Sequence, residues 1–347
     1  MPFFVGSYEK DANYFSRDEE TIRLITQANN RVNTILLGLP RIGKTTLIHQ
    51  AAEQLENKYG QVCLYLDILF TEDLKGFAKY FNSELSRKFP DKLKESSDVR
   101  SEREVEQLIN SLFGFLDKQK QKVVICIDEF QQVIRYPEKN AITIMRNATQ
   151  KLKNACFIFG CQSEYLLNDF FDDSKQGFFI NFDLVQVNPI KANTYSQFIR
   201  DNFSKNKVDI STDAVNFIIR WTNRHTYYTQ ILCKRLFDSG IEEIDIENVH
   251  EECGKILKEN EPAYFMYRNL LSPVQWLLLK AIAKEETVYH PTAKQFLMQH
   301  NIGTPANVQR ALEALLNKEM VLASHDEKGR YFQVHSTFLS RWLEGLD

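Results

Sequence analysis

The segment from Gly38 to Thr45, GLPRIGKT, constrains the fold of this chain more than any other feature. It fits the pattern G-x-x-x-x-G-K-[ST] and lies between an apolar run and a stretch with helical spacing. Glycines let such a loop curl so that its backbone N–H groups face one point, and the following helix adds the positive end of its dipole. The segment therefore predicts a phosphate-binding loop between a strand and a helix.

The first half of the chain alternates short apolar runs with longer amphipathic stretches. This alternation is typical of a parallel sheet with helices on both faces. We therefore expect an α/β P-loop NTPase core with three αβα layers, and the pattern leaves the strand order open. The expected strands are Asn33 to Leu37, Val62 to Asp67, Val123 to Asp128, Ala155 to Phe159 and an edge strand, Phe179 to Leu184.

Helical spacing fills the intervals between these strands. The expected helices are Lys44 to Tyr59, Leu74 to Arg87, Glu104 to Lys118 and Ala141 to Lys153. The segment Phe89 to Glu104 is rich in Lys, Glu, Asp and Ser, and we expect it to be a mobile surface connection.

Two carboxylates, Asp128 and Glu129, end the apolar run VVICI. Because the carboxyl ends of parallel strands meet at one edge of a sheet, we expect this pair beside the phosphate loop, as in a Walker B motif. Lys44 would reach the β- and γ-phosphates, and Thr45 and Asp128 would hold Mg²⁺. Glu129 would orient and deprotonate the attacking water.

The residues expected to contact the nucleotide in this loop are Gly38, Leu39, Pro40, Arg41, Ile42, Gly43, Lys44, Thr45 and Thr46. For Arg41 a solvated surface charge is the alternative. The strand Ala155 to Phe159 is followed by a polar tip in which Gln162 or Ser163 could read the γ-phosphate. A polar turn that merely ends the strand is the competing interpretation.

Strand signals stop after Asn188-Pro189, and helices are expected at 194–206, 212–222, 226–238 and 246–260, with Ser211 and Asp245 as N-caps. Ser272-Pro273 and Thr304-Pro305 open further helices, with another at 292–299 between them, and the turn DEKG joins two short strands, 321–324 and 331–335. Three helices and a hairpin are the winged-helix plan. We expect a core at 1–190, an all-helical lid at 191–262 and a winged helix at 263–347.

The third helix of a winged helix normally enters the major groove of DNA. Here that helix, Val308 to Glu319, carries Arg310 and Lys318 against Glu313 and Glu319, so it offers little net charge to phosphates. His325, Lys328 and Arg330 in the hairpin could touch a backbone, but charged hairpin tips are usually solvated. We therefore favour contact with the core or with a protein partner over DNA, which stays possible.

Composition limits the class of protein. The formal net charge of −3 gives no excess of positive charge for nucleic acid or a membrane surface. No apolar run approaches the roughly 20 residues needed to span a bilayer, and the N-terminus lacks a signal peptide pattern, so a cytoplasmic protein is expected. The six cysteines form no CxxC pair, which favours buried, reduced thiols over a zinc site or disulfides.

With these motifs in order, the chain resembles the "ATPase domain predominantly from Archaea" family within the STAND and AAA+ superfamily. The resemblance covers most of the chain. Its marks are Phe15-Ser16-Arg17, GLPRIGKTTL, ICIDEFQ, FIFGCQS, HTYYTQ and FLSRWL.

The resemblance implies ATP or ADP with Mg²⁺, held between a core and a helical lid that a winged helix follows. It places Phe15 and Arg17 near the base and His225 toward the nucleotide. Relatives usually have Gly-Ser where this chain has Cys161-Gln162, and they carry an arginine near 175–179 that is missing here. Hydrolysis could therefore be slow, or a neighbouring subunit could supply the arginine, with Arg146 as a candidate.

Three functions remain open at this point. The preferred one is an ATP-hydrolysing regulatory switch that acts on a protein partner or through self-association. The second is a DNA-associated ATPase of transposition, plasmid maintenance or defence that reads DNA with its winged helix. The third is an ATP-binding module with negligible hydrolysis.

Overall fold

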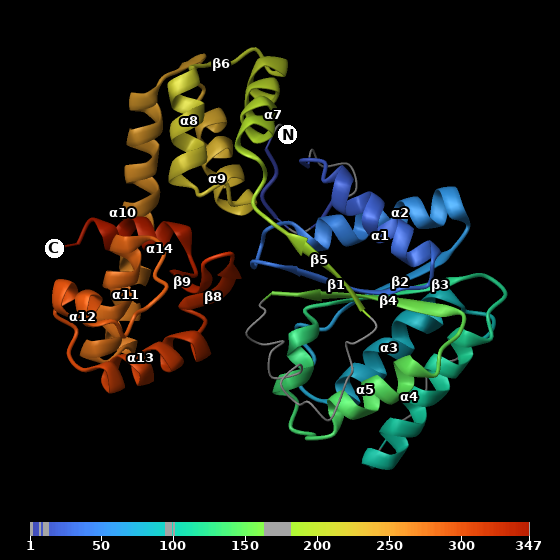
Figure 1. The fold of residues 1–347 in the computed structure, drawn as a ribbon. Helices are drawn as coiled ribbons and strands as arrows, with labels where there is room; N and C mark the ends of the chain where they lie inside the picture. The colour runs from blue at the N-terminus through green and yellow to red at the C-terminus, as the bar shows by residue number, and fades with distance from the viewer. Residues whose placement is uncertain are drawn as a thin grey trace. The chain divides into compact units, whose positions relative to one another are not determined.

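The structure, a computed structural model, describes residues 3–6, 8, 9, 14–93, 99, 101–162 and 182–346 (Figure 1). The chain divides into two compact units. Ser16–Asn188 forms the first, called here the sheet unit, and Met1–Phe15 with Pro189–Asp347 forms the second, called the C-terminal unit.

A five-stranded parallel sheet is the centre of the sheet unit, and its order is β2-β3-β4-β1-β5. Every residue of β3 and β4 is buried, as expected of strands that helices cover on both faces. The strands are β1 (Asn33–Gly38), β2 (Val62–Asp67), β3 (Val123–Asp128), β4 (Ala155–Cys161) and β5 (Phe182–Val187).

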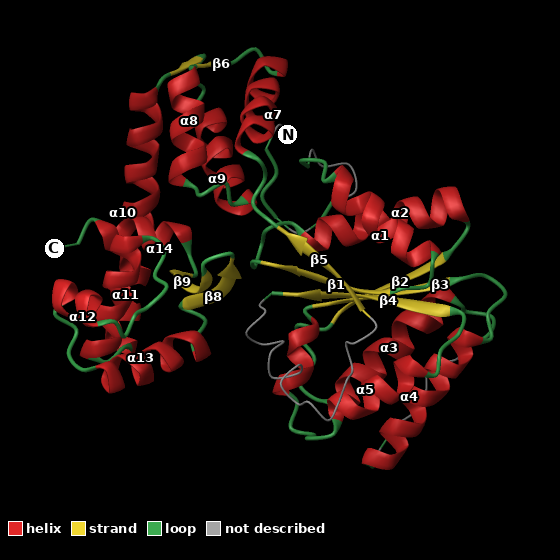
Figure 2. Ribbon diagram, in the orientation of Figure 1, coloured by secondary structure: helices red, strands yellow, loops and turns green. Residues whose placement is uncertain are grey.

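Helices cover both faces of this sheet, which confirms the expected three layers (Figure 2). On one face lie α1 (Asp18–Asn29) and α2 (Lys44–Tyr59). On the other lie α3 (Leu74–Lys88), α4 (Glu102–Asp117) and α5 (Ala141–Gln150), and a 3₁₀ helix, η1 (Phe130–Arg135), follows β3. Apolar residues three and four apart form the buried stripe of each helix; in α2 these include Leu47, Ile48, Ala51 and Leu55.

The expected elements of the sheet unit need three corrections. Helix α1 was not expected, and α4 begins at Glu102, within the expected 89–104 connection, because Ser101 forms a capping box with Glu104. Residues 94–98 and 100 of that connection lie outside the described residues. The edge strand, Phe182–Val187, continues past the expected end at Leu184, with buried Val185 and Val187 alternating with exposed residues; residues 179–181 of the expected strand lie outside the described residues.

The C-terminal unit begins with four helices, α7 (Ala192–Lys205), α8 (Thr212–Trp221), α9 (Thr226–Asp238) and α10 (Ile246–Leu270). Side chains of Ser211 and Asp245 cap α8 and α10 as predicted. The expectation of an all-helical segment was wrong, because β6 (Asp209–Ile210) and β7 (Glu243–Ile244) form a two-residue parallel pair.

Three further helices and a hairpin complete this unit, as the winged-helix plan requires. They are α11 (Pro273–Glu285), α12 (Lys294–His300), α13 (Pro305–Asn317), β8 (Val321–Asp326) and β9 (Gly329–Val334). The predicted caps Ser272 and Thr304, each followed by proline, open α11 and α13. A final helix, α14 (Thr337–Glu344), was not predicted.

Helix α10 joins the two halves of the C-terminal unit. The sequence pattern ended it at Asn260, whereas the structure continues it to Leu270 with Pro262 inside. Arg341 of α14 adds a second connection: its guanidinium donates to the carbonyl of Trp221 at 2.9 Å and pairs with Glu286 at 2.7 Å. That guanidinium-bearing side chain is only 10% exposed.

All six cysteines are buried, which confirms the expected burial, and none of them is paired in a disulfide. Among the residues that the structure describes, no helix combines the length and apolar character that crossing a bilayer requires.

Candidate functional site

The phosphate loop lies where the motif predicts it, between the end of β1 and the start of α2. Gly43 has φ of +107°, a backbone conformation that side-chain-bearing residues rarely adopt. This turn directs the chain into α2, so that the first N–H groups of the helix lie at the end of the loop.

Lys44 opens α2 and is 4% exposed. Its Nζ donates to the carbonyls of Gly38 at 2.9 Å and Leu39 at 3.0 Å, and so closes over its own loop. Burial lowers the pKa of the Lys44 ammonium, while the negative charges of Glu129 and Asp128 act in the opposite direction.

Asp128 ends β3 and is 2% exposed. Its Oδ2 accepts hydrogen bonds from the hydroxyl of Thr45 at 2.6 Å and from that of Tyr65 at 3.1 Å. Its Oδ1 accepts from the backbone N–H of Glu129 at 3.0 Å. The structure thus brings the end of the loop and the end of the acidic strand together.

The donors at this point fit a small hard cation. Among the described residues, no group of three or more His, Cys, Asp or Glu side chains could hold a metal ion. Thr45 and Asp128 place two oxygen atoms side by side, and Mg²⁺ commonly needs only one or two protein oxygens because it takes its other ligands from phosphate and water.

Glu129 has a left-handed backbone, with φ of 58°. The side-chain amides of Gln131 and Gln162 both donate to its Oε2. Burial raises the pKa of Glu129, and the Lys44 ammonium opposes that rise. The sensor candidate Gln162 therefore lies against the candidate base, whereas Ser163 lies outside the described residues.

Arg17 and Phe15, neighbours in the sequence, belong to different units. The buried guanidinium of Arg17 donates to the carbonyl of Ile42 in the phosphate loop at 3.2 Å and to that of Asn188 at 2.9 Å. The ring of Phe15 contacts Tyr195 and Phe198, with centroids 5.8 and 5.5 Å away. Arg17 thus supports the loop from outside, and contact of either residue with nucleotide stays a prediction.

The remaining candidates are placed as follows. Arg41 is exposed and has φ of 59°. Thr46 is half-buried in the first turn of α2. His225 is buried at the start of α9, makes no capping bond with its side chain, and lies 4.7 Å from the ring of Tyr228.

Sequence reasoning missed three residues that shape this site: Tyr65, Gln131 and Gly160. A Cβ added at Gly160 would overlap Oδ1 of Asp128 and lie 3.3 Å from Ile48, so glycine permits the close approach of β4 to that carboxylate. Gln131 stands two residues after Glu129 in the quoted motif ICIDEFQ. No sequence pattern marked Tyr65 as a site residue; it lies two residues before the end of β2.

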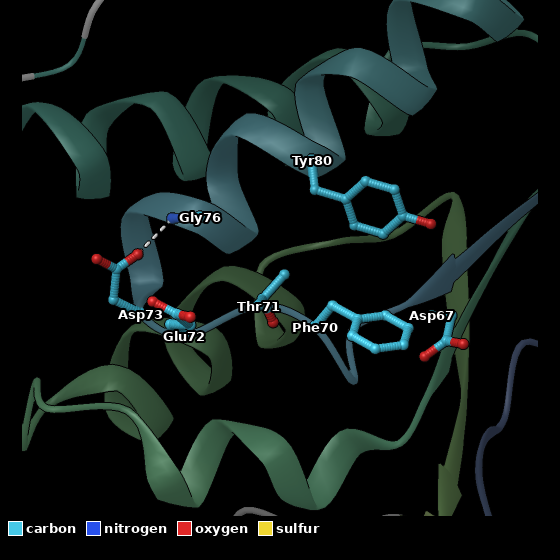
Figure 3. A pocket seen from close by; sticks show the side chains of 7 residues that line it. All are labelled: Asp67, Phe70, Thr71, Glu72, Asp73, Gly76 and Tyr80. Carbon is cyan, nitrogen blue, oxygen red and sulfur yellow. Dashed lines mark hydrogen bonds between the residues drawn. The ribbon is translucent and has the colours of Figure 1, made fainter.

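A separate hollow of about 610 Å³ opens between the end of β2 and the start of α3 (Figure 3). Its described lining contains no residue of the phosphate loop. Phe70 is 87% exposed there, and Asp73 is engaged as the cap of α3, accepting from the N–H of Gly76 at 2.6 Å. Of the described lining residues, Asp67 is the one that the strand register pairs with Asp128.

Two family models match the sequence. A model described as "ATPase domain predominantly from Archaea" matches residues 14–229, and one described as "Probable winged helix domain" matches residues 262–345. No curated protein matches the sequence.

Solved structures share the fold over nearly the whole chain. A Walker-type ATPase of Pyrococcus abyssi is similar with a TM-score of 0.71 and 18% identity, over 99% of each chain. The ORC2 protein of Aeropyrum pernix, solved as ADPNP-ADP complexes, has a TM-score of 0.65 and 14% identity over 97% of this chain and 94% of its own. The ORC1 protein of Aeropyrum pernix in complex with DNA has a TM-score of 0.56 and 13% identity, over 95% and 92%.

Proposed function

This chain belongs to the family described as "ATPase domain predominantly from Archaea", and on that premise we propose that it binds and hydrolyses Mg²⁺-ATP at the Lys44 loop as a regulatory switch. One observation carries the proposal. The Thr45 hydroxyl and the Asp128 carboxylate meet at 2.6 Å, so the loop and the acidic strand can act on one ligand.

Each residue of the site has a role in this proposal. Backbone N–H groups from Gly38 to Thr46 surround the phosphates, and Lys44 exchanges its two carbonyl partners for β- and γ-phosphate oxygens. Thr45 and Asp128 would hold Mg²⁺, the latter through water, and the ion would supply positive charge against the phosphate oxygens. Glu129 orients the attacking water and takes its proton.

The parts around the site supply the switch. We assign residues 1–190 to the ATPase core, 191–262 to a helical lid and 263–347 to the winged helix. Phe15 and Arg17 are candidate nucleotide contacts near the base. Gln162 and His225, with Ser163 outside the described residues, are the candidate sensors. A protein partner or a second copy of the chain would bind differently to the ATP and ADP states. A second copy could also supply an arginine to the site, with Arg146 as the candidate.

Calorimetric titration with ATP in the presence of Mg²⁺ tests the site. Lys44→Ala should abolish ATP binding. The matched control is Lys58→Ala, because Lys58 is exposed in the last turn of the same helix and its Nζ donates to Gln54 of the same helix. Undiminished binding by the Lys44 variant would refute the site.

Light scattering tests the switch separately. The full chain is sized without nucleotide, with ADP and with a non-hydrolysable ATP analogue. Assembly only with the analogue supports a switch through self-association. The same mass in all three states excludes a switch through self-association, so that a protein partner would have to distinguish the nucleotide states.

A DNA-associated ATPase is the second candidate, favoured by the winged-helix match and by the DNA-bound ORC1 structure of similar fold. On α13 exposed Arg310 is balanced by Glu313, and directly after the helix exposed Lys318 is balanced by Glu319. This candidate predicts duplex binding that weakens with salt and responds to ATP. Absence of any mobility shift at low salt would remove it.

Negligible hydrolysis is the third candidate, and the altered sensor position at Cys161-Gln162 favours it. Phosphate release from the wild type and from Glu129→Gln decides this point. Equal rates at background level support a binding module, whereas a faster wild type supports an ATPase.

A further inference from the structure

The carboxylate of Glu129 is held at only one of its two oxygens. Its Oε2 accepts from Nε2 of Gln131 and from Nε2 of Gln162. None of the described residues donates to Oε1. A carboxylate held in this way keeps one oxygen for a further hydrogen bond.

The two glutamines, called here the glutamine pair, also contact each other. Oε1 of Gln131 accepts from the backbone N–H of Gln162 at 3.3 Å. Gln131 belongs to η1, which follows β3, while Gln162 directly follows β4. The buried side chain of Gln131 therefore connects the ends of two neighbouring strands and is fixed at both its amide oxygen and its amide nitrogen.

We propose that Gln131 and Gln162 are positioning residues for the proposed hydrolysis, which fix Glu129 through Oε2 and leave Oε1 to accept the proton of the attacking water. This inference rests on the proposed function. The water oxygen forms a bond to the γ-phosphorus while the bond from that phosphorus to the ADP oxygen breaks. The water proton passes to Oε1 of Glu129 and later leaves to solvent.

The chemistry of the three side chains supports this assignment. The amide nitrogens of the glutamine pair can only donate, so they fix one carboxylate oxygen without competing for the proton of the attacking water. Orientation matters as well, because a small misplacement of a base can cost about a hundredfold in rate. Two donors converging on one oxygen restrict rotation of the carboxylate about its last side-chain bond.

Steady-state hydrolysis by the full chain, with ATP affinity measured by calorimetry, tests the inference. Gln131→Met keeps the length of the side chain and removes both hydrogen bonds. It should lower kcat by about tenfold and leave KM and ATP affinity unchanged. Gln132→Met is the matched control, because Gln132 lies beside it in η1 but donates to the carbonyl of Thr71 at 3.0 Å. This control should keep the wild-type kcat.

Gln131→Glu distinguishes two roles of Gln131: orienting the Glu129 carboxylate, or merely holding the backbone at the end of β4. It keeps an oxygen that accepts from the N–H of Gln162 but cannot donate to Glu129. A purely structural bridge would be rescued by this variant, whereas orientation predicts a kcat as low as that of Gln131→Met. Gln162→Met, outside the strands, should show the same loss and add nothing in a double variant with Gln131→Met.

The outcomes distinguish the two proposals. If Glu129→Gln hydrolyses as fast as the wild type, the proposed base is wrong and both proposals fail. If Glu129→Gln is inactive but Gln131→Met and Gln162→Met keep full kcat, only the glutamine pair is overturned. A full rescue by Gln131→Glu also overturns it.

Discussion

The hydroxyl of Thr45, in the first turn of α2, donates a hydrogen bond of 2.6 Å to Oδ2 of Asp128 at the end of β3, across 83 positions of sequence. Neither side chain could reach the other unless β3 and the phosphate loop shared one edge of the sheet. The strand order β2-β3-β4-β1-β5 provides that edge, because only β4 separates β3 from β1.

Removal of the Thr45 hydroxyl should weaken ATP binding only when Mg²⁺ is present. Thr45→Ala loses a metal ligand, so ATP affinity with Mg²⁺ should fall by about tenfold or more. Thr45→Ser keeps the oxygen and should bind like the wild type. Calorimetry with Mg²⁺ and with a chelator measures both, and an equal loss without Mg²⁺ would contradict the assigned role.

A methyl group at position 160 should destabilise the sheet unit. In Gly160→Ala the new Cβ meets Oδ1 of buried Asp128, and overpacking of this kind costs about 1–3 kcal/mol of unfolding free energy. Urea denaturation measures the loss. Gly114→Ala, within α4, is the control: nothing lies within 4 Å of its added Cβ, and it should gain about 0.5–1 kcal/mol. Equal stability of the two variants would show that β4 can shift to make room for the added methyl group.

Loss of the Tyr65 hydroxyl should leave Asp128 with one donor fewer. Tyr65→Phe removes the hydrogen bond of 3.1 Å but keeps the ring against His49, at a centroid distance of 4.2 Å. We expect a loss of about 1–3 kcal/mol in unfolding free energy, since the acceptor is a buried charge. Tyr59→Phe, at a residue 52% exposed, should change nothing. A Tyr65 variant as stable as that control would mean that other groups satisfy Asp128.

The ion pair of Arg23 with Asp183 should make stability depend on pH. Nε of Arg23 lies 2.9 Å from Oδ2 of Asp183 and joins α1 to β5. The hydrogen bond from Arg23 lowers the pKa of Asp183 in the folded state, so its contribution is present above the unfolded pKa of about 3.9 and is lost as pH falls through the lower folded pKa.

Because Arg23 is half exposed, Asp183→Asn should cost no more than about 1 kcal/mol at pH 7. The difference from the wild type should vanish in strong acid and shrink in high salt. Urea denaturation across this pH range measures it. A difference that persists at the lowest pH would have to come from packing of the side chain and not from its charge.

Local pattern predicted the parts of the site that belong to one strand or one turn. Lys44 follows from the loop spacing, and Asp128 from an apolar strand that ends in acid. Tyr65 was missed because its partner Asp128 belongs to another strand and the strand order was open; the same holds for the contact of Gln131 with Gln162 after β4. The β6–β7 pair escaped for a related reason: two residues carry no periodicity, and their pairing depends on how α8 and α9 pack.

Helix α10 contains 25 residues and is therefore about 37 Å long. It leads directly from the helices after Pro189 into the half that bears the β8–β9 hairpin. Arg341 of that half also donates a hydrogen bond to the carbonyl of Trp221 at the end of α8. Within 189–346 the helices α8 and α9 and the hairpin-bearing half are therefore joined by a continuous helix and not by a long loop. A tilt of α8 would therefore carry the hairpin-bearing half with it as one body, because α10 and the Arg341 contacts join the two.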